Sequence, residues 1–315
     1  MRLVLLLAAL ALACSRAAPP PVYGLGTAPE QRFRFSADER TEIDGTPVTI
    51  ERAADVVLRA LPSHDGDTPV DLYVDRYSIQ IDGAPGGASE LSISADGLSA
   101  RTIEGPVTLG AKEPAPGGDT VLELRARPVA SVVLDTAGAA THPIWTSPHP
   151  VWTGVALLDW MLLALPTRPA GGEAAWIGAR PLPQIGSYAL GVDLPMRWER
   201  RPGSDTLRGE GRVARDSLHL ADGFDGRADV EAQSEVALLP DGRVREAVLR
   251  LALDFAATNG THVQSSHKVR LTCSDCAASV NPLPEGSDTG KGRDGTPQQG
   301  HLDDLSDHGG VRRGL

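Results

Sequence analysis

The dominant pattern in the second half of this chain is alternation of apolar and polar residues. It is clearest in four segments, which are residues 192–199, 230–238, 247–255 and 261–273. Because successive side chains of a strand point to opposite faces, a period of two predicts β-strands with one buried and one wet face. Turn residues separate the last three segments, with Pro240-Asp241-Gly242 after the second and Asn259-Gly260 after the third. Both predict antiparallel hairpins.

The first half shows the same alternation in shorter pieces. Apolar pairs or triplets at every second position mark them: Phe33 and Phe35; Val48 and Ile50; Tyr77, Ile79 and Ile81; Leu91 and Ile93; Leu122 and Leu124. Turn dipeptides such as Asp44-Gly45, Asp82-Gly83 and Asp96-Gly97 separate several of these pieces. We therefore expect a mainly β protein whose strands pair antiparallel.

One segment breaks the alternation. Residues 151–165 are apolar on nearly every side, with Asp159 as their single charge, and Pro166 follows directly. An all-round apolar helix is typical of a protein interior, and a proline ends it by denying the next hydrogen bond. Spanning a bilayer takes about twenty residues, so this segment predicts a buried helix rather than a membrane span.

These elements predict a β-rich body over residues 31–280. Two strand groups, at about 31–135 and 190–273, are joined by the helix near 151–165. The expected fold is mainly β, with antiparallel meandering sheets in a half-barrel or a two-sheet arrangement and one buried hydrophobic helix. This order of elements loosely resembles the half-barrel sheets of bacterial lipoprotein carriers, which wrap an apolar element in their concavity. The resemblance implies a binding role.

The N-terminus predicts where the protein is located in the cell. Arg2 precedes an unbroken apolar run, and the small residue Ala13 stands directly before Cys14. This order resembles a bacterial lipoprotein signal peptide over residues 1–13, which implies a diacylglyceryl (palmitate-type) anchor on Cys14. The leucine of the usual motif sits one place late, at Leu12, and ordinary signal peptidase cutting after Ala13 is the alternative. Ser15, where inner-membrane lipoproteins often have Asp, favours the outer membrane.

The two ends of the mature chain differ from its body. Residues 14–30 contain Pro19-Pro20-Pro21 and predict an extended tether between the membrane anchor and the body. Residues 281–315 are rich in Gly, Asp and Ser and predict a disordered tail. The formal net charge of −11 argues against nucleic acid as a partner. We expect the membrane, through Cys14, and an unknown protein or apolar ligand as partners.

A short repeat precedes the expected helix. His142-Pro143-Ile144-Trp145-Thr146 recurs as His149-Pro150-Val151-Trp152-Thr153. The two histidines and two tryptophans form a candidate ligand surface. No Asp, Glu or Cys lies in the repeat, so we expect no metal there. The favoured interpretation is structural: Pro150 occupies the first turn of the helix and the tryptophans cap the core.

The other two cysteines form the pair Cys273-Ser274-Asp275-Cys276. In an oxidising compartment such a pair predicts a short-loop disulfide. The alternative is a redox or metal-dependent protein that uses this pair with His267 as a neighbour. Redox enzymes place such a pair at a helix N-terminus, whereas Asn281-Pro282 soon ends any helix here.

No catalytic, metal-binding or nucleotide-binding motif stands out in the body, and we expect no cofactor. The sequence therefore predicts a lipid-anchored lipoprotein of the bacterial cell envelope, with a non-enzymatic binding or structural function, held at the outer membrane.

Overall fold

The computed structural model describes residues 29–84, 89–102, 105–135, 140–152, 156–167, 174–183, 192–201, 204–219 and 225–276. The chain divides into two compact units, Met1–Asn281 and Pro282–Leu315, and every described residue belongs to the first. The expected signal peptide, most of the tether and the expected tail lie outside the described residues.

All the strands of the described residues join one antiparallel sheet of 14 strands. The strands of the N-terminal half are β1 (Glu30–Ile43), β2 (Thr46–Ala60), β3 (Thr68–Asp82), β4 (Ser89–Ser94), β5 (Gly97–Thr102), β6 (Gly105–Gly110), β7 (Ala130–Leu134) and β8 (Ala140–Thr146). Those of the C-terminal half are β9 (Ala175–Pro181), β10 (Asp193–Arg200), β11 (Thr206–His219), β12 (Asp225–Leu238), β13 (Val244–Ala257) and β14 (His262–Cys273). The helices are α2 (Val121–Ala126) and α3 (Leu157–Ala164).

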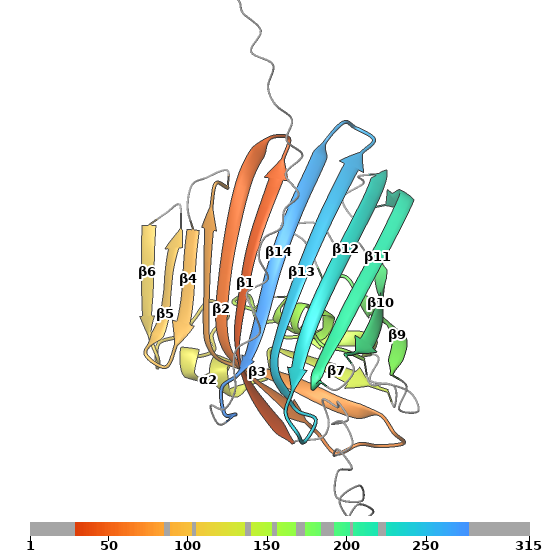
Figure 1. The fold of residues 1–315 in the computed structure, drawn as a ribbon. Helices are drawn as coiled ribbons and strands as arrows, with labels where there is room; N and C mark the ends of the chain where they lie inside the picture. The colour runs from red at the N-terminus through yellow and green to blue at the C-terminus, as the bar shows by residue number, and fades with distance from the viewer. Residues whose placement is uncertain are drawn as a thin grey trace, which may run out of the picture. The chain divides into compact units, whose positions relative to one another are not determined.

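The first and last strands meet in the middle of the sheet. The strand order is β6-β5-β4-β3-β2-β1-β14-β13-β12-β11-β10-β9, so β1 pairs with β14 (Figure 1). The two predicted strand groups therefore form two arms of one sheet, and both arms grow by hairpins between consecutive strands. The expected antiparallel β class is confirmed. The two-sheet arrangement is wrong, because the pairing of β1 with β14 unites both groups.

Strand β3 forks one arm. Its C-terminal half pairs with β4, whereas its N-terminal half, from Thr68 to Leu72, pairs with β7. Strand β8 then pairs with β7 and extends this second branch. The fork lets β3 support two separate continuations of the sheet.

Tight turns set the register of the hairpins. Asp44 and Gly45 link β1 to β2 with φ values of 48° and 81°, and Ile43 pairs with Thr46 across the turn. Two positive φ values in a two-residue loop match the twist of the flanking strands, which favours Gly and Asp. The predicted turns at residues 240–242 and 259–260 likewise close the β12–β13 and β13–β14 hairpins.

The alternation of the sequence becomes the two faces of the sheet. We call inner the face that carries the buried residues, among them Phe33, Phe35, Leu249, Val269 and Leu271. The intervening positions point to the outer face, where charged pairs such as Arg212 with Asp229 lie in water.

Helix α3 covers part of the inner face. It contacts β14, β13, β12 and β9, and all of its residues except Asp159 are buried (Figure 1). The helix ends just before Pro166, as expected, but it begins at Leu157 rather than near residue 151. Residues 150–152 form a turn in which the Trp152 N–H donates to the His149 carbonyl at 2.9 Å. The prediction that Pro150 occupies the first helical turn is therefore wrong.

Helix α2 replaces a predicted strand. Leu122 and Leu124 suggested a period of two, yet residues 121–126 are helical. The cause is a capping box, in which Thr120 Oγ1 accepts from the Glu123 N–H and the Glu123 carboxylate accepts from the Thr120 N–H. Two otherwise unpaired N–H groups are satisfied in this way, which stabilises a helix start at Val121.

Candidate functional site

Five polar side chains gather on the inner face. They are Glu39 and Thr41 from β1, Arg52 from β2, and Ser265 and His267 from β14, and we call them the inner polar cluster. Strand register brings them together, because Glu39 pairs with His267 and Thr41 with Ser265. Glu39 is 1% exposed and His267 is 5% exposed. Buried polar groups on this scale require partners.

A directed chain of hydrogen bonds supplies those partners. Thr41 Oγ1 donates to Glu39 Oε1 at 3.1 Å, and the other carboxylate oxygen accepts from Arg52 Nη1 at 2.9 Å. The Thr41 and Ser265 hydroxyls are hydrogen-bonded at 2.7 Å, and Ser265 Oγ lies 2.6 Å from His267 Nε2. Each hydroxyl has one proton. Since Thr41 donates to Glu39, Ser265 donates to Thr41, and the His267 Nε2–H donates to Ser265.

This proton order decides what the cluster can do. Serine, histidine and glutamate follow one another as in a catalytic triad, but here His267 donates to Ser265 instead of accepting its proton. His267 Nδ1 is 3.8 Å from Glu39 Oε2, beyond a hydrogen bond, and Ser265 is only 4% exposed. The arrangement is a satisfied buried network rather than a nucleophile with its base.

Burial controls the charges of this network. It lowers the pKa of His267 to about 4, although nearby Glu39 acts in the opposite direction and Arg52 in the same one. The imidazole is therefore neutral near pH 7, while Glu39 and Arg52 form an ion pair at 2.9 Å. Burial also raises the pKa of Tyr77, and the positive charge of Arg52 opposes this shift.

Aromatic rings bound the cluster on two sides. Trp160 of α3 lies over His267 with ring centroids 4.7 Å apart. Trp152 packs edge-on against Tyr77 at 6.2 Å. The cluster thus lies between the strands under α3 and the segment that precedes α3 in the chain.

An apolar row runs beside the cluster toward one end of the sheet. Register places Arg52 opposite Ile79, then Ile79 opposite Leu91, Leu91 opposite Ala100 and Ala100 opposite Val107. We call the last four residues the inner apolar row. Three of them are half-buried against the core, and Val107 on β6 is 44% exposed. The inner face is therefore apolar beyond the area that α3 covers.

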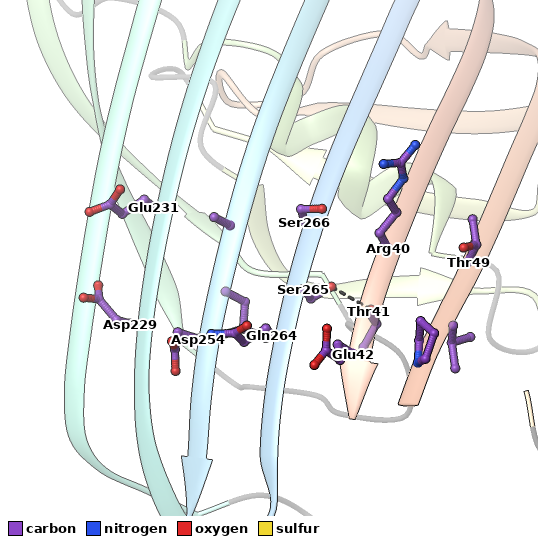
Figure 2. Close-up of a pocket in the computed structure, with 14 residues that line it drawn as sticks. Arg40, Thr41, Glu42, Thr49, Asp229, Glu231, Asp254, Gln264, Ser265 and Ser266 are labelled. Atoms are coloured by element: carbon purple, nitrogen blue, oxygen red, sulfur yellow. Dashed lines mark hydrogen bonds between the residues drawn. The ribbon is translucent and has the colours of Figure 1, made fainter. Parts of the chain in front are cut away.

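A hollow of about 630 Å³ lies on strands β12, β13, β14, β1 and β2 (Figure 2). Four carboxylates line it, those of Glu42, Asp229, Glu231 and Asp254. Arg212 pairs with Asp229 and Glu231, and His262 pairs with Asp254. One guanidinium thus faces two of these carboxylates, and a third is hydrogen-bonded to a histidine ring.

The cysteine pair forms the predicted disulfide, since Cys273 and Cys276 are bonded to each other. Both sulfurs are consumed in this bond, which leaves no thiolate for a metal. His267 lies on the same strand six residues from Cys273. At about 3.3 Å per residue this separates them by roughly 20 Å, so His267 is no neighbour of the disulfide.

The repeat before α3 is only partly within the described residues. His142 and Trp145 lie on β8, but their side chains are not described. The His149 side chain is 9% exposed and its Nε2 lies 3.9 Å from Asp119 Oδ2. Trp152 is 3% exposed. Cys14, the expected anchor, lies outside the described residues. Among the helices that are described, none has the length and apolar content needed to cross a membrane.

Sequence reasoning missed the inner polar cluster, although a signal was present. Glu39 and Thr41 continue the register of Phe33 and Phe35, so the alternation already placed both on the buried face. A charged residue at such a position requires a partner from a neighbouring strand. Arg52, the partner of Glu39, lies only 13 residues away, but Ser265 lies 224 residues from Thr41, where a local pattern cannot reveal the pairing.

Comparisons with known proteins identify no family for this chain and only weakly similar structures. No family model matches the chain, and no curated protein matches it. A structure titled as lipid–protein interactions in lipovitellin aligns at a TM-score of 0.43 and 8% identity, over 81% of this chain and 26% of that one. This chain thus spans about a quarter of that lipovitellin chain.

Two bacterial structures align more weakly. The β domain of the Bordetella autotransporter BrkA gives a TM-score of 0.30 at 11% identity, over 78% of this chain and all of that one (100%). A DUF1329 family protein from Desulfovibrio piger gives 0.17 at 8% identity, over 80% and 89% of the two chains. The fold described above therefore rests on this chain's own strand pairing.

Proposed function

We propose that this protein is a lipid-anchored lipoprotein of the bacterial envelope that binds an apolar ligand on the inner face of its sheet. The role is binding rather than catalysis. The anchor is the diacylglyceryl group expected on Cys14, and the outer membrane is the expected site.

One observation carries the binding role. The inner apolar row extends the core to Val107, which stays 44% exposed although α2 contacts β3 and β5 of the same arm. Exposed apolar surface of this kind marks binding sites in soluble bodies. An apolar ligand that lay along the row would remove it from water.

Helix α3 supports the same proposal. All of its residues except Asp159 are apolar and buried, and it occupies the inner face as an apolar ligand would. Its N-cap residue, Ala156, makes no side-chain capping bond, so contacts with the sheet hold it in place. An unclosed antiparallel sheet around an apolar helix also resembles the half-barrel of lipoprotein carriers.

The proposed location in the cell envelope has independent support. The disulfide between Cys273 and Cys276 is typical of an oxidising compartment. It leaves Cys14 as the odd cysteine, which a thioether anchor explains. Metabolic labelling with a palmitate analogue tests the anchor. We expect label in the wild type and none in Cys14→Ser, with Ser15→Ala as the control that keeps it. An unlabelled wild type overturns the anchor.

Native mass spectrometry of the full chain extracted from membranes tests the ligand. We expect a co-purifying small amphiphile on the wild type. Val107→Asp puts a charge in the row and abolishes the adduct, whereas Thr108→Asp, on the opposite face of the same strand, retains it. A wild type free of any adduct, or one that carries only a protein partner, overturns the ligand role.

A further inference from the structure

Strand β9 ends one arm of the sheet, and its free edge differs from the other end. Its backbone pairs with β10 on one side only, and no other described strand pairs with it. The Leu182 N–H donates to the Val192 carbonyl, and the Arg200 N–H donates to the Ala174 carbonyl. Hydrogen bonds to β10 therefore fall at even positions.

The odd positions must then point away from β10. In an antiparallel pair, hydrogen-bonded and non-hydrogen-bonded residues alternate along the strand. The N–H and C=O groups of Ala175, Ile177 and Ala179 thus face outward along the free edge. Pro181 has no N–H and closes this edge at its far end.

Within the described residues, this edge lacks the usual protection. Natural sheets protect their edges with charges, prolines or bulges. The other end of the sheet, β6, has Pro106 inside the strand. In β9, residues 175–179 carry no charge and no proline, and Ile177 is 74% exposed, the most exposed large apolar residue among those described. An apolar, hydrogen-bonding edge of this kind is a template for another strand.

We propose that the occupant of this edge is β9 of a second copy of this chain, paired antiparallel about Ile177. The sequence is self-complementary around that residue. Ile177 meets Ile177, the small Ala175 meets Ala179, and Trp176 meets Gly178, which has no side chain to compete for its space. The three outward residues of each copy form about six main-chain hydrogen bonds, since each facing pair exchanges two.

Charge does not oppose this pairing. Arg197 of β10 pairs with Ile177, so the two Arg197 side chains of the dimer stand three strand spacings apart. At about 4.8 Å per spacing this is roughly 14 Å. Physiological salt screens charges over about 8 Å, so the repulsion is weak.

Cysteine cross-linking in membranes tests the register with the full chain. On the two-fold axis, Ile177→Cys places two thiols opposite each other, so mild oxidation yields a disulfide-linked dimer. Val107→Cys, on the other end strand, and the wild type stay monomeric under the same oxidant. A monomeric Ile177→Cys overturns the proposal, as does an equal yield from Val107→Cys, which indicates random collision.

A second experiment fixes the pairing. Ala175→Cys alone gives no cross-link because its partner is Ala179, whereas co-expressed Ala175→Cys and Ala179→Cys chains cross-link to each other. Ile177→Lys guards the edge and converts the dimer to monomer in native mass spectrometry, with an unchanged circular dichroism spectrum. A dimer that survives Ile177→Lys assigns the interface elsewhere and overturns the proposal. None of these outcomes depends on the ligand.

Discussion

Trp160 of α3 lies over His267 of β14, with ring centroids 4.7 Å apart and planes inclined by 32°. The helix therefore rests on the most buried titratable base of the inner polar cluster. His267, which contacts the helix, is connected to Glu39 and Arg52 by a chain of hydrogen bonds that crosses from strand to strand.

Acid destabilises the folded chain through His267. Its pKa is about 4 in the folded chain and about 6.5 when unfolded, so between these values only the unfolded state binds the proton. Stability is full above pH 6.5 and falls as the pH drops to 4, by on the order of 3 kcal/mol. Urea unfolding at pH 7.5 and 4.5 measures this loss. His267→Gln shows a smaller difference, and an equal one contradicts the assignment.

Removal of the Trp160 ring loosens α3. Trp160 is 2% exposed, and truncation of a buried Trp to Ala costs about 3–5 kcal/mol. We expect Trp160→Ala to lower the urea midpoint and to speed hydrogen exchange in residues 157–164 above all. Leu122→Ala, at a residue that is 52% exposed, is the control and changes stability by less than about 1 kcal/mol. Uniformly faster exchange assigns Trp160 to the general core.

Glu39 and Arg52 contribute to the stability of the fold mainly when both are present. Glu39→Met alone leaves the Arg52 charge largely buried without its anion and costs about 3–5 kcal/mol. The double variant Glu39→Met/Arg52→Met removes both charges and recovers most of that loss. A double-mutant cycle from thermal unfolding measures the coupling energy. Additive losses mean that the two side chains act independently.

The sequence predicted β10, β12, β13 and β14 of the C-terminal arm and missed β9 and β11. Strands β10, β12, β13 and β14 alternate clearly because most of their inward positions hold apolar residues, with Ser234, Ser265 and His267 as buried polar exceptions. In β11 the inward positions include Gly209 and Gly211, which break the hydrophobic period. Trp198 and Met196 of β10 fill the space above these glycines. The apolar–polar alternation is therefore absent from β11, because large side chains of the neighbouring strand fill that part of the core.

Such complementarity predicts a strong effect at Gly209. A Cβ there would lie 2.8 Å from the Trp198 ring, and that ring is fully buried. Overpacking a core costs about 1–3 kcal/mol, so Gly209→Ala destabilises by this amount. At Gly110 the nearest atom to a new Cβ is 3.8 Å away, and Gly110→Ala is neutral or slightly stabilising. Equal thermal midpoints for the two variants contradict the packing argument.

The disulfide stabilises the body modestly. It closes a loop between residues three apart, and constraint of so short a loop in the unfolded chain contributes about 2 kcal/mol. Cys273→Ser/Cys276→Ser therefore lowers the urea midpoint a little and keeps the fold, because β14 is held by β1 and β13 along its whole length. Thiol trapping after export finds the wild-type pair oxidised. A pair that cycles between thiols and disulfide in the cell assigns it a redox role instead.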